Sequence, residues 1–221
     1  MIFKRIIHAL LGTPKAPKRY AQLFESIRNI RPKNILEIGT WTGSRALQMI
    51  ETAKEFTPAR EIHYYGFDLF EEFTEGAMSK ELSKRPPSLA EVTAKLSVTG
   101  AGIHLYKGNT QETLPKTVHS LPLMDVIFID GGHSIKTVEN DWRFTSSLVS
   151  GKGVIIFDDY WENRTEAGAK PTVDTIDRER FSVELMPVVD SVRNTEFGEL
   201  IIRFAKVKKR RNTTEKGGKG L

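Results

Sequence analysis

The chain of 221 residues contains no cysteine. That absence excludes disulfides, thiolate nucleophiles and cysteine-bound zinc, and it makes a cytoplasmic protein the default expectation. No apolar run reaches the ~20 residues that a membrane-spanning helix requires. Residues 1–12 are basic and then apolar, but they lack the long apolar core and cleavage site of a signal peptide. We therefore expect an amphipathic N-terminal helix and no transmembrane segment.

Acidic residues are missing from the start of the chain and nearly missing from its end. Residues 1–20 carry +5, and residues 206–221 carry seven basic side chains against one acid. Because the whole chain has a net charge of +5, the body between these ends is acidic. Enzymes that act on nucleic acid usually carry their basic surface on the folded face. We therefore expect no specific nucleic-acid partner, and a disordered basic tail at residues 208–221.

The sequence also lacks the Gly-x-Gly-x-x-Gly motif of pyrophosphate-binding loops. Between an apolar strand and a helix it has Glu37-Ile-Gly-Thr-Trp-Thr-Gly43 instead. Glycines at such a junction let the backbone turn and approach a ligand, although they can also be purely structural. An acidic loop favours a cationic ligand without phosphates. Asp68 ends the next strand, where it can accept hydrogen bonds from a ribose.

Apolar strands alternate with amphipathic helices along most of the chain. This alternation predicts a parallel sheet with helices on both faces. Two β-rich runs near the end have no helix between them, which predicts an antiparallel hairpin at one edge. The expected strands are 34–40, 62–68, 103–107, 124–130, 154–158, 181–189 and 199–207, and the expected helices are 43–56, 88–98, 110–119 and 134–149. We predict a Rossmann-like, doubly wound, seven-stranded α/β domain at residues 31–207, preceded by a helical extension at residues 1–30.

Three carboxylates follow two of the most apolar strands. Asp130 ends the strand at 124–130, and Asp158 and Asp159 end the strand at 154–158. Carboxylates at neighbouring strand ends repel one another unless a cation lies between them, and Mg²⁺ prefers such oxygen ligands. His133 follows Asp130 closely, and an imidazole titrates near neutrality as a general base must. Alternatively, Asp130 caps the helix that begins near Ser134, and the pair at 158–159 lies in a solvated turn.

Together, the glycine loop, Asp68 and the terminal hairpin resemble the class I S-adenosylmethionine-dependent methyltransferases over residues 30–207. The resemblance implies that Gly39 and Gly43 line the methionine moiety, that Asp68 binds the ribose and that Asn109 lies near the adenine. Trp41 departs from the family pattern, which has glycine there. The implied cofactor-binding residues are Glu37, Gly39, Thr40, Trp41, Gly43, Asp68, Asn109, Thr110 and Asp130.

The acids at the strand ends narrow this resemblance to the metal-dependent sugar and macrolide O-methyltransferases, and more distantly to catechol-type enzymes. The narrower resemblance implies a magnesium ion held by Asp130, Asp158 and Asp159, with His133 and Asp130 as catalytic residues. The acceptor would be a hydroxyl of a small molecule such as a sugar, a polyketide or another secondary metabolite. Residues 71–87 and 160–175 are the expected substrate lids.

Other functions remain compatible with the sequence. A nicotinamide-dependent oxidoreductase shares the order of strand, glycine loop, helix, strand and acid, but it would need the missing central glycine. A methyltransferase that acts on nucleic acid or protein, a binding module without turnover and a hydroxylase on the same scaffold are further alternatives. The N-terminal helix offers a surface through which two copies could pair, so a homo-oligomer is also compatible.

Overall fold

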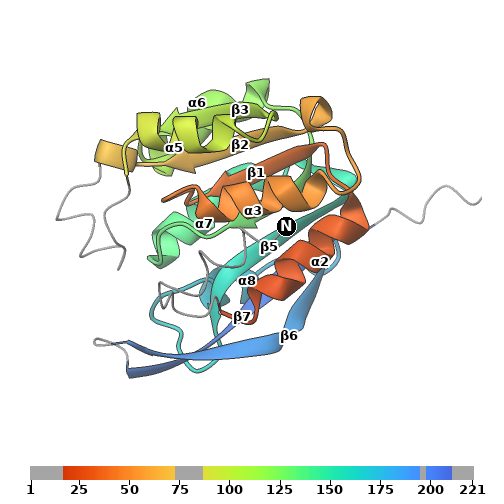
Figure 1. Ribbon diagram of the computed structural model, residues 1–221. Coiled ribbons are helices and arrows are strands. Elements are labelled where there is room, and N and C mark those ends of the chain that lie inside the picture. Colours follow the sequence, from red (N-terminus) through yellow and green to blue (C-terminus); the bar gives the residue numbers. More distant parts are fainter. Residues whose placement is uncertain (1–16, 73–86, 195–197, 211–221) are drawn as a thin grey trace, which may run out of the picture.

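The computed structural model describes residues 17–72, 87–194 and 198–210. These residues form one seven-stranded sheet with the order β3-β2-β1-β4-β5-β7-β6 (Figure 1). The strands are β1 (Asn34–Ile38), β2 (His63–Asp68), β3 (Gly102–Lys107), β4 (Met124–Ile129), β5 (Val149–Trp161), β6 (Phe181–Asn194) and β7 (Gly198–Lys209). The helices are α2 (Tyr20–Ile30), α3 (Ser44–Ala53), α5 (Leu89–Ser97), α6 (Thr110–Thr117), α7 (Ile135–Thr145) and α8 (Lys170–Asp174), with short 3₁₀ turns η1 (Ala59–Glu61), η2 (Phe70–Glu72) and η3 (Val118–Ser120).

The order in which the chain adds strands to the sheet reverses between β1 and β4. From β1 the chain winds outward through β2 to β3, and it then returns to β4 on the other side of β1. The strands β3, β2, β1, β4 and β5 are parallel neighbours, and β7 is antiparallel to both β5 and β6. The predicted fold class is therefore confirmed. In open α/β sheets, ligands bind beyond the carboxyl ends of the strands at such a reversal.

Helices cover both faces of the sheet. Successive residues of a strand point to opposite faces, so Ile35 packs into one core and Leu36 into the other. The core that includes Ile35 lies under α2, α3 and α5, the helices in front of the sheet in Figure 1. The core that includes Leu36 lies under α6, α7 and α8. This double burial explains why the central strands are apolar almost throughout.

Helix α2 belongs to the core of the domain. Leu23 and Ile27 have exposed fractions of 0% and pack with residues of β1, β4 and β5. The second half of the expected extension at residues 1–30 thus covers the sheet, whereas the helix expected at residues 1–12 lies outside the described residues. Within the described ranges, no helix combines the length and the apolar character needed to cross a membrane.

Strand β5 is longer than the sequence predicts. Tyr160 and Trp161, which we expected in a lid, pair with β7 opposite Arg203 and Ile202 and are buried. The reason is that the antiparallel strand β7 offers hydrogen-bonding partners beyond the end of β4. The other expected lid at residues 71–87 lies mostly outside the described residues. Of the expected basic tail, positions 208 and 209 continue β7, and residues 211–221 are not described.

Candidate active site

The loop between β1 and α3 lies directly against the end of β4. Gly39 has φ +92° and Gly43 has φ +67°, both in the left-handed region that favours glycine. A Cβ atom at residue 39 would stand 1.9 Å from the carbonyl oxygen of Asp130. Trp41 also has a positive φ, 43°, and its side chain is 45% exposed. The loop therefore needs glycine at position 39 for close packing and carries an indole ring on its open side.

A buried polar group lies at the base of this loop. The Tyr64 hydroxyl donates a hydrogen bond to Oε2 of Glu37 and lies 3.0 Å from the Thr40 hydroxyl. Glu37 is fully buried, and burial raises the pKa of its carboxyl to about 8 against the opposing hydrogen bond from Tyr64. Its other oxygen, Oε1, is buried and has no hydrogen-bond partner among the described residues. The site thus holds an acceptor that a bound cationic group would satisfy.

Asp68 ties the glycine loop to the end of β2. Its carboxylate accepts hydrogen bonds from the backbone N–H of Trp41 at 2.6 Å and of Phe70 at 3.0 Å. Burial raises its pKa. Gly108 donates its N–H to the carbonyl of Asp68, which brings the start of α6 beside it. There the Asn109 side chain caps α6 by accepting from the N–H of Gln111 at 2.9 Å.

A cavity of about 540 Å³ opens between the glycine loop and the residues that follow β4. This size falls within the range of small-molecule sites. The ten residues that line the cavity come from α2, the glycine loop, the start of α3 and the turn after β4: Tyr20, Gly39, Thr40, Trp41, Thr42, Ser44, Arg45, Asp130, Gly131 and His133. Five of the sequence-predicted site residues therefore line one cavity.

His133 and Asp159 form a contact pair at this cavity. Their atoms Nε2 and Oδ2 lie 2.8 Å apart. The His133 ring stacks on Trp161 with centroids 5.6 Å apart, and the indole Nε1 donates to the other oxygen of Asp159 at 3.2 Å. Although burial raises the pKa of Asp159, the charge and hydrogen bond of His133 outweigh it and bring the pKa to about 2. Asp159 is therefore ionised at neutral pH, where it orients the imidazole.

A bulge in β5 brings Asp158 and Asp159 to the same rim. The pairing between β5 and β7 shifts register between Phe157 and Tyr160, and Asp159 has φ +52°. Without this irregularity, consecutive side chains of a strand would point to opposite faces. One oxygen of each of Asp130, Asp158 and Asp159 lies within 4.8 Å of the others. Burial, followed by the neighbouring carboxylates Asp158 and Asp159, raises the pKa of Asp130 well above its usual range.

Asp158 is bound by two residues that precede or begin α2. Arg19 donates from Nε to Oδ1 at 2.8 Å and from Nη2 to Oδ2 at 3.1 Å. The Tyr20 hydroxyl donates to Asp158 Oδ2 at 2.6 Å and lies 3.2 Å from Asp130 Oδ2. Asp158 is therefore not in a solvated turn. The alternative that Asp130 caps the following helix is also wrong, because Ser134 caps α7 by accepting a hydrogen bond from the N–H of Thr137.

Sequence reasoning missed four residues of this region: Arg19, Tyr20, Arg45 and Tyr64. Arg45 extends from the first turn of α3, and its guanidinium carbon lies 3.3 Å from the centroid of the Tyr20 ring. Arg19 and Tyr20 lie at the start of an amphipathic helix, but no local spacing indicates that Arg19 has a partner 139 positions away. Tyr64 lies within a strand pattern, so its sequence context indicated only core packing.

The strand order, the antiparallel β7, the glycine loop and the acid after β2 define a class I methyltransferase fold. The family model for a methyltransferase domain matches residues 36–160, more than half of the chain. The chain belongs to this family of methyltransferases.

Individual relatives are distant. An uncharacterized protein of Acanthamoeba polyphaga mimivirus is 31% identical over 91 residues, which are 40% of this chain and 41% of that protein. The chain thus matches about two fifths of that relative's length. The O-methyltransferase of Bacillus cereus, solved in complex with SAH, has a TM-score of 0.60 at 15% identity, covering 94% of this chain and 88% of that one. The O-methyltransferase TomG of Streptomyces achromogenes, involved in tomaymycin synthesis and solved with SAM, has a TM-score of 0.56 at 15% identity, covering 86% and 78%. At these identities, the solved structures show the fold alone.

Proposed function

We propose that this methyltransferase transfers the methyl group of S-adenosylmethionine to a hydroxyl group of a small molecule. The observation that carries the proposal is the His133–Asp159 contact of 2.8 Å beside a cavity that the glycine loop also lines. A cofactor loop and an oriented base therefore meet in one space. The two solved O-methyltransferases with this fold were bound to SAH and SAM, which supports the same cofactor here.

The residues of the loop suit a sulfonium cofactor. The buried carboxyl group of Glu37 has one oxygen without a protein partner, and a bound ammonium group would favour its ionised form, which accepts hydrogen bonds, over the protonated form of the empty site. Gly39, Thr40, Trp41 and Gly43 would hold the methionine part through the backbone, with no phosphate to neutralise. Asp68 would bind the ribose hydroxyls. Asn109 and Thr110, which begin α6 beside Asp68, would border the adenine.

When bound, S-adenosylmethionine would supply an electrophilic methyl group, which the acceptor oxygen would take up by direct displacement with release of a neutral thioether. His133 accepts the hydroxyl proton, and the Asp159 carboxylate stabilises the imidazolium that forms. Asp130 lines the cavity beside His133 and would contact both cofactor and acceptor. Most of the rate enhancement would come from holding the two reactants in line.

Magnesium, which the narrower resemblance implies, stays a prediction. The three carboxylates lie close enough together to share an ion. However, both oxygens of Asp158 already accept hydrogen bonds from Arg19, and Oδ2 also accepts one from Tyr20. Asp158 could bind an ion only if these donors were displaced. The proposed reaction therefore contains no step through a metal.

The acceptor class, a cytoplasmic location and a homo-oligomeric state also stay predictions. The acidic body of the chain supports a small molecule over nucleic acid, since a nucleic-acid enzyme would need a basic face around the cavity. A protein or RNA acceptor is the second outcome that a test must include.

Calorimetry with S-adenosylhomocysteine and with NAD⁺ would test the cofactor. We expect a single site for the first and none for the second, and the reverse would overturn the proposal. Release of S-adenosylhomocysteine, measured with panels of sugars, catechols, polyketides, RNA and protein, would test the acceptor. In that assay, His133→Gln should lower kcat by ~10²- to 10⁴-fold. His119→Gln, in the exposed turn η3, is the matched control and should leave kcat unchanged.

A further inference from the structure

The acidic rim formed by Asp130, Asp158 and Asp159 already contains a cation that belongs to the chain. We propose that Arg19 stands in the place of the magnesium ion that the resemblance implies, and that this enzyme holds its rim together without a divalent metal. The relevance of this inference to catalysis rests on the proposed function. The ion-binding experiment that tests it does not depend on that function.

The first argument is the number of acceptor positions on Asp158. An ionised carboxylate offers about four lone-pair positions. Oδ1 accepts from Nε of Arg19 at 2.8 Å and from the N–H of Asp159 at 2.7 Å. Oδ2 accepts from the hydroxyl of Tyr20 at 2.6 Å and from Nη2 of Arg19 at 3.1 Å. All four positions are therefore occupied by protein donors, and none is left for a metal.

The second argument is burial. Arg19 is 6% exposed and Asp158 is 2% exposed. Magnesium keeps several of its waters and requires near-octahedral geometry, so it needs room that this contact does not offer. A planar guanidinium, in contrast, matches a carboxylate with two parallel hydrogen bonds. The contact between Arg19 and Asp158 has this paired form.

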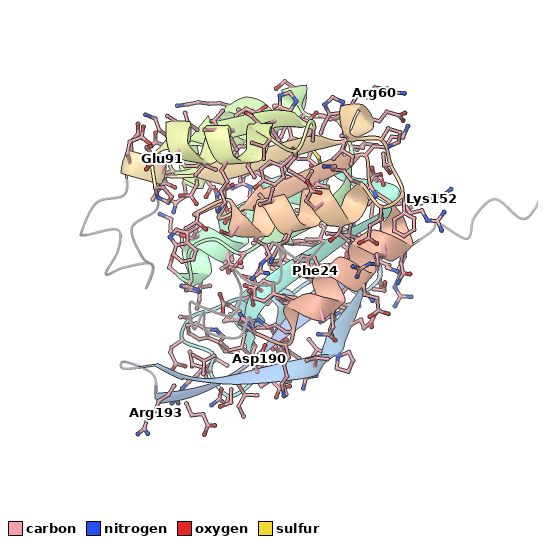
Figure 2. The ribbon with its side chains drawn as sticks, viewed as in Figure 1. Phe24, Arg60, Glu91, Lys152, Asp190 and Arg193 are labelled. Atoms are coloured by element: carbon pink, nitrogen blue, oxygen red, sulfur yellow. The ribbon has the colours of Figure 1, made fainter. Side chains whose placement is uncertain are left out.

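The third argument is that Arg19 is held from its other side. Its Nη1 lies 3.2 Å from Asp190 Oδ2, and Asp190 also accepts from the backbone N–H groups of Lys18 and Arg19. Asp190, labelled in Figure 2, comes from β6 where this strand runs beside α2. The guanidinium also lies over the rings of Tyr20 and Phe204, at 5.0 and 5.6 Å from their centroids. An incoming ion would have to displace the start of α2 as well as one side chain.

Arg19 is thus a positioning residue. It orients Asp158, and Asp158 in turn holds the hydroxyl of Tyr20, whose side chain lines the cavity. The guanidinium of Arg19 supplies the positive charge that a metal ion would otherwise bring to Asp158, so the rim needs no ion from solution.

Titration with Mn²⁺ as a probe for Mg²⁺, followed by electron paramagnetic resonance, would test the inference on the full chain with and without S-adenosylhomocysteine. We expect no saturable Mn²⁺ site in the wild type. Arg19→Gln leaves the rim without its cation, and we expect this variant to gain one saturable Mn²⁺ site that the wild type lacks. Asp158→Asn in the Arg19→Gln background should remove the new site. Arg28→Gln, which removes an arginine of α2 from its exposed ion pair with Glu55, is the matched control and should gain no site.

Saturable Mn²⁺ binding to the wild type that Asp158→Asn abolishes would overturn the inference. This comparison needs no Arg19 variant, so it decides the matter even if Arg19→Gln does not fold. Because the readout is ion binding, an enzyme that methylates no tested hydroxyl would count against the proposed function alone.

Discussion

Gly39 and Asp130 are in van der Waals contact through their backbones, and a Cβ on residue 39 would lie only 1.9 Å from the Asp130 carbonyl oxygen. This contact joins the end of β1 to the end of β4, the two strands between which the sheet reverses its order. The glycine loop and the turn after β4 are therefore packed so closely that there is no room for a side chain at residue 39.

Gly39→Ala should consequently destabilise the protein and abolish cofactor binding. The new methyl group must displace backbone atoms, and alanine disfavours a φ of +92°. We expect a loss of at least about 3 kcal/mol in the free energy of unfolding, measured by urea denaturation. Gly151→Ala is the control, because a Cβ there meets nothing within 4 Å. Equal stability of the two variants would contradict the assigned packing of the loop.

The buried Glu37 should make the stability of the cofactor-free enzyme depend on pH. Its pKa is about 8 when folded and ~4.3 in an unfolded chain, so the folded state binds the extra proton between these values. The contribution of this residue to the free energy of unfolding therefore falls by about 3 kcal/mol as the pH rises from 5 to 7, and it continues to fall until about pH 8. Glu37→Gln should remove this slope in urea denaturation, while Glu61→Gln, at an exposed ion pair, should keep it.

Asp159 should act in the opposite direction and at lower pH. Its folded pKa of about 2 lies below the ~3.9 of an unfolded chain, so its contribution to stability is complete above pH ~4 and disappears as the pH falls toward 2. The difference in unfolding free energy between wild type and Asp159→Asn should be about 2 kcal/mol near neutral pH and vanish near pH 2. A difference that does not change with pH would show that the carboxylate is not paired with His133.

The buried ion pair of Arg19 should matter far more for stability than an exposed one. Arg19→Gln leaves Asp158 buried without its cation, and we expect a loss of about 3–5 kcal/mol by urea denaturation. Arg28→Gln breaks the exposed pair between α2 and Glu55 and should leave stability unchanged within error. Combining Arg19→Gln with Asp158→Asn should recover part of the loss, because the uncompensated charge is removed. An Arg19→Gln variant as stable as the wild type would contradict the burial of this pair.

The fold could be predicted from the sequence because its signals are local. The apolar runs that become β1, β4 and β5 are bounded by polar turns, and the helix expected at residues 88–98 is α5, which begins with a capping box of Ser88 and Glu91. The three carboxylates and His133 were also identified correctly as neighbours, since parallel strands end at a common edge. These inferences needed only the order of residues along each strand.

The contacts between distant segments could not be predicted in this way. In the sequence, Arg19 is one of several basic residues near the start of the chain, whereas in the structure it is buried against Asp158. Nothing in its neighbourhood distinguishes it from Lys18, which precedes it. The bulge at Asp159 was equally hidden, because it arises from pairing with β7 near the other end of the chain. The magnesium prediction rested on the three acids and on the family resemblance, and neither of these reveals the donors that reach Asp158.

The bridge from Arg19 to Asp158 and Asp190 has a consequence for biosynthesis. A ribosome makes Arg19 before every strand of the sheet, and Asp190 emerges 171 positions later. Until then the carboxylates on β4 and β5 face each other while one anchor of their counter-charge is absent. A nascent chain stalled before β6 would therefore hold an Arg19 side chain that lacks its second carboxylate, and the pocket is fully assembled only after β6 has been made.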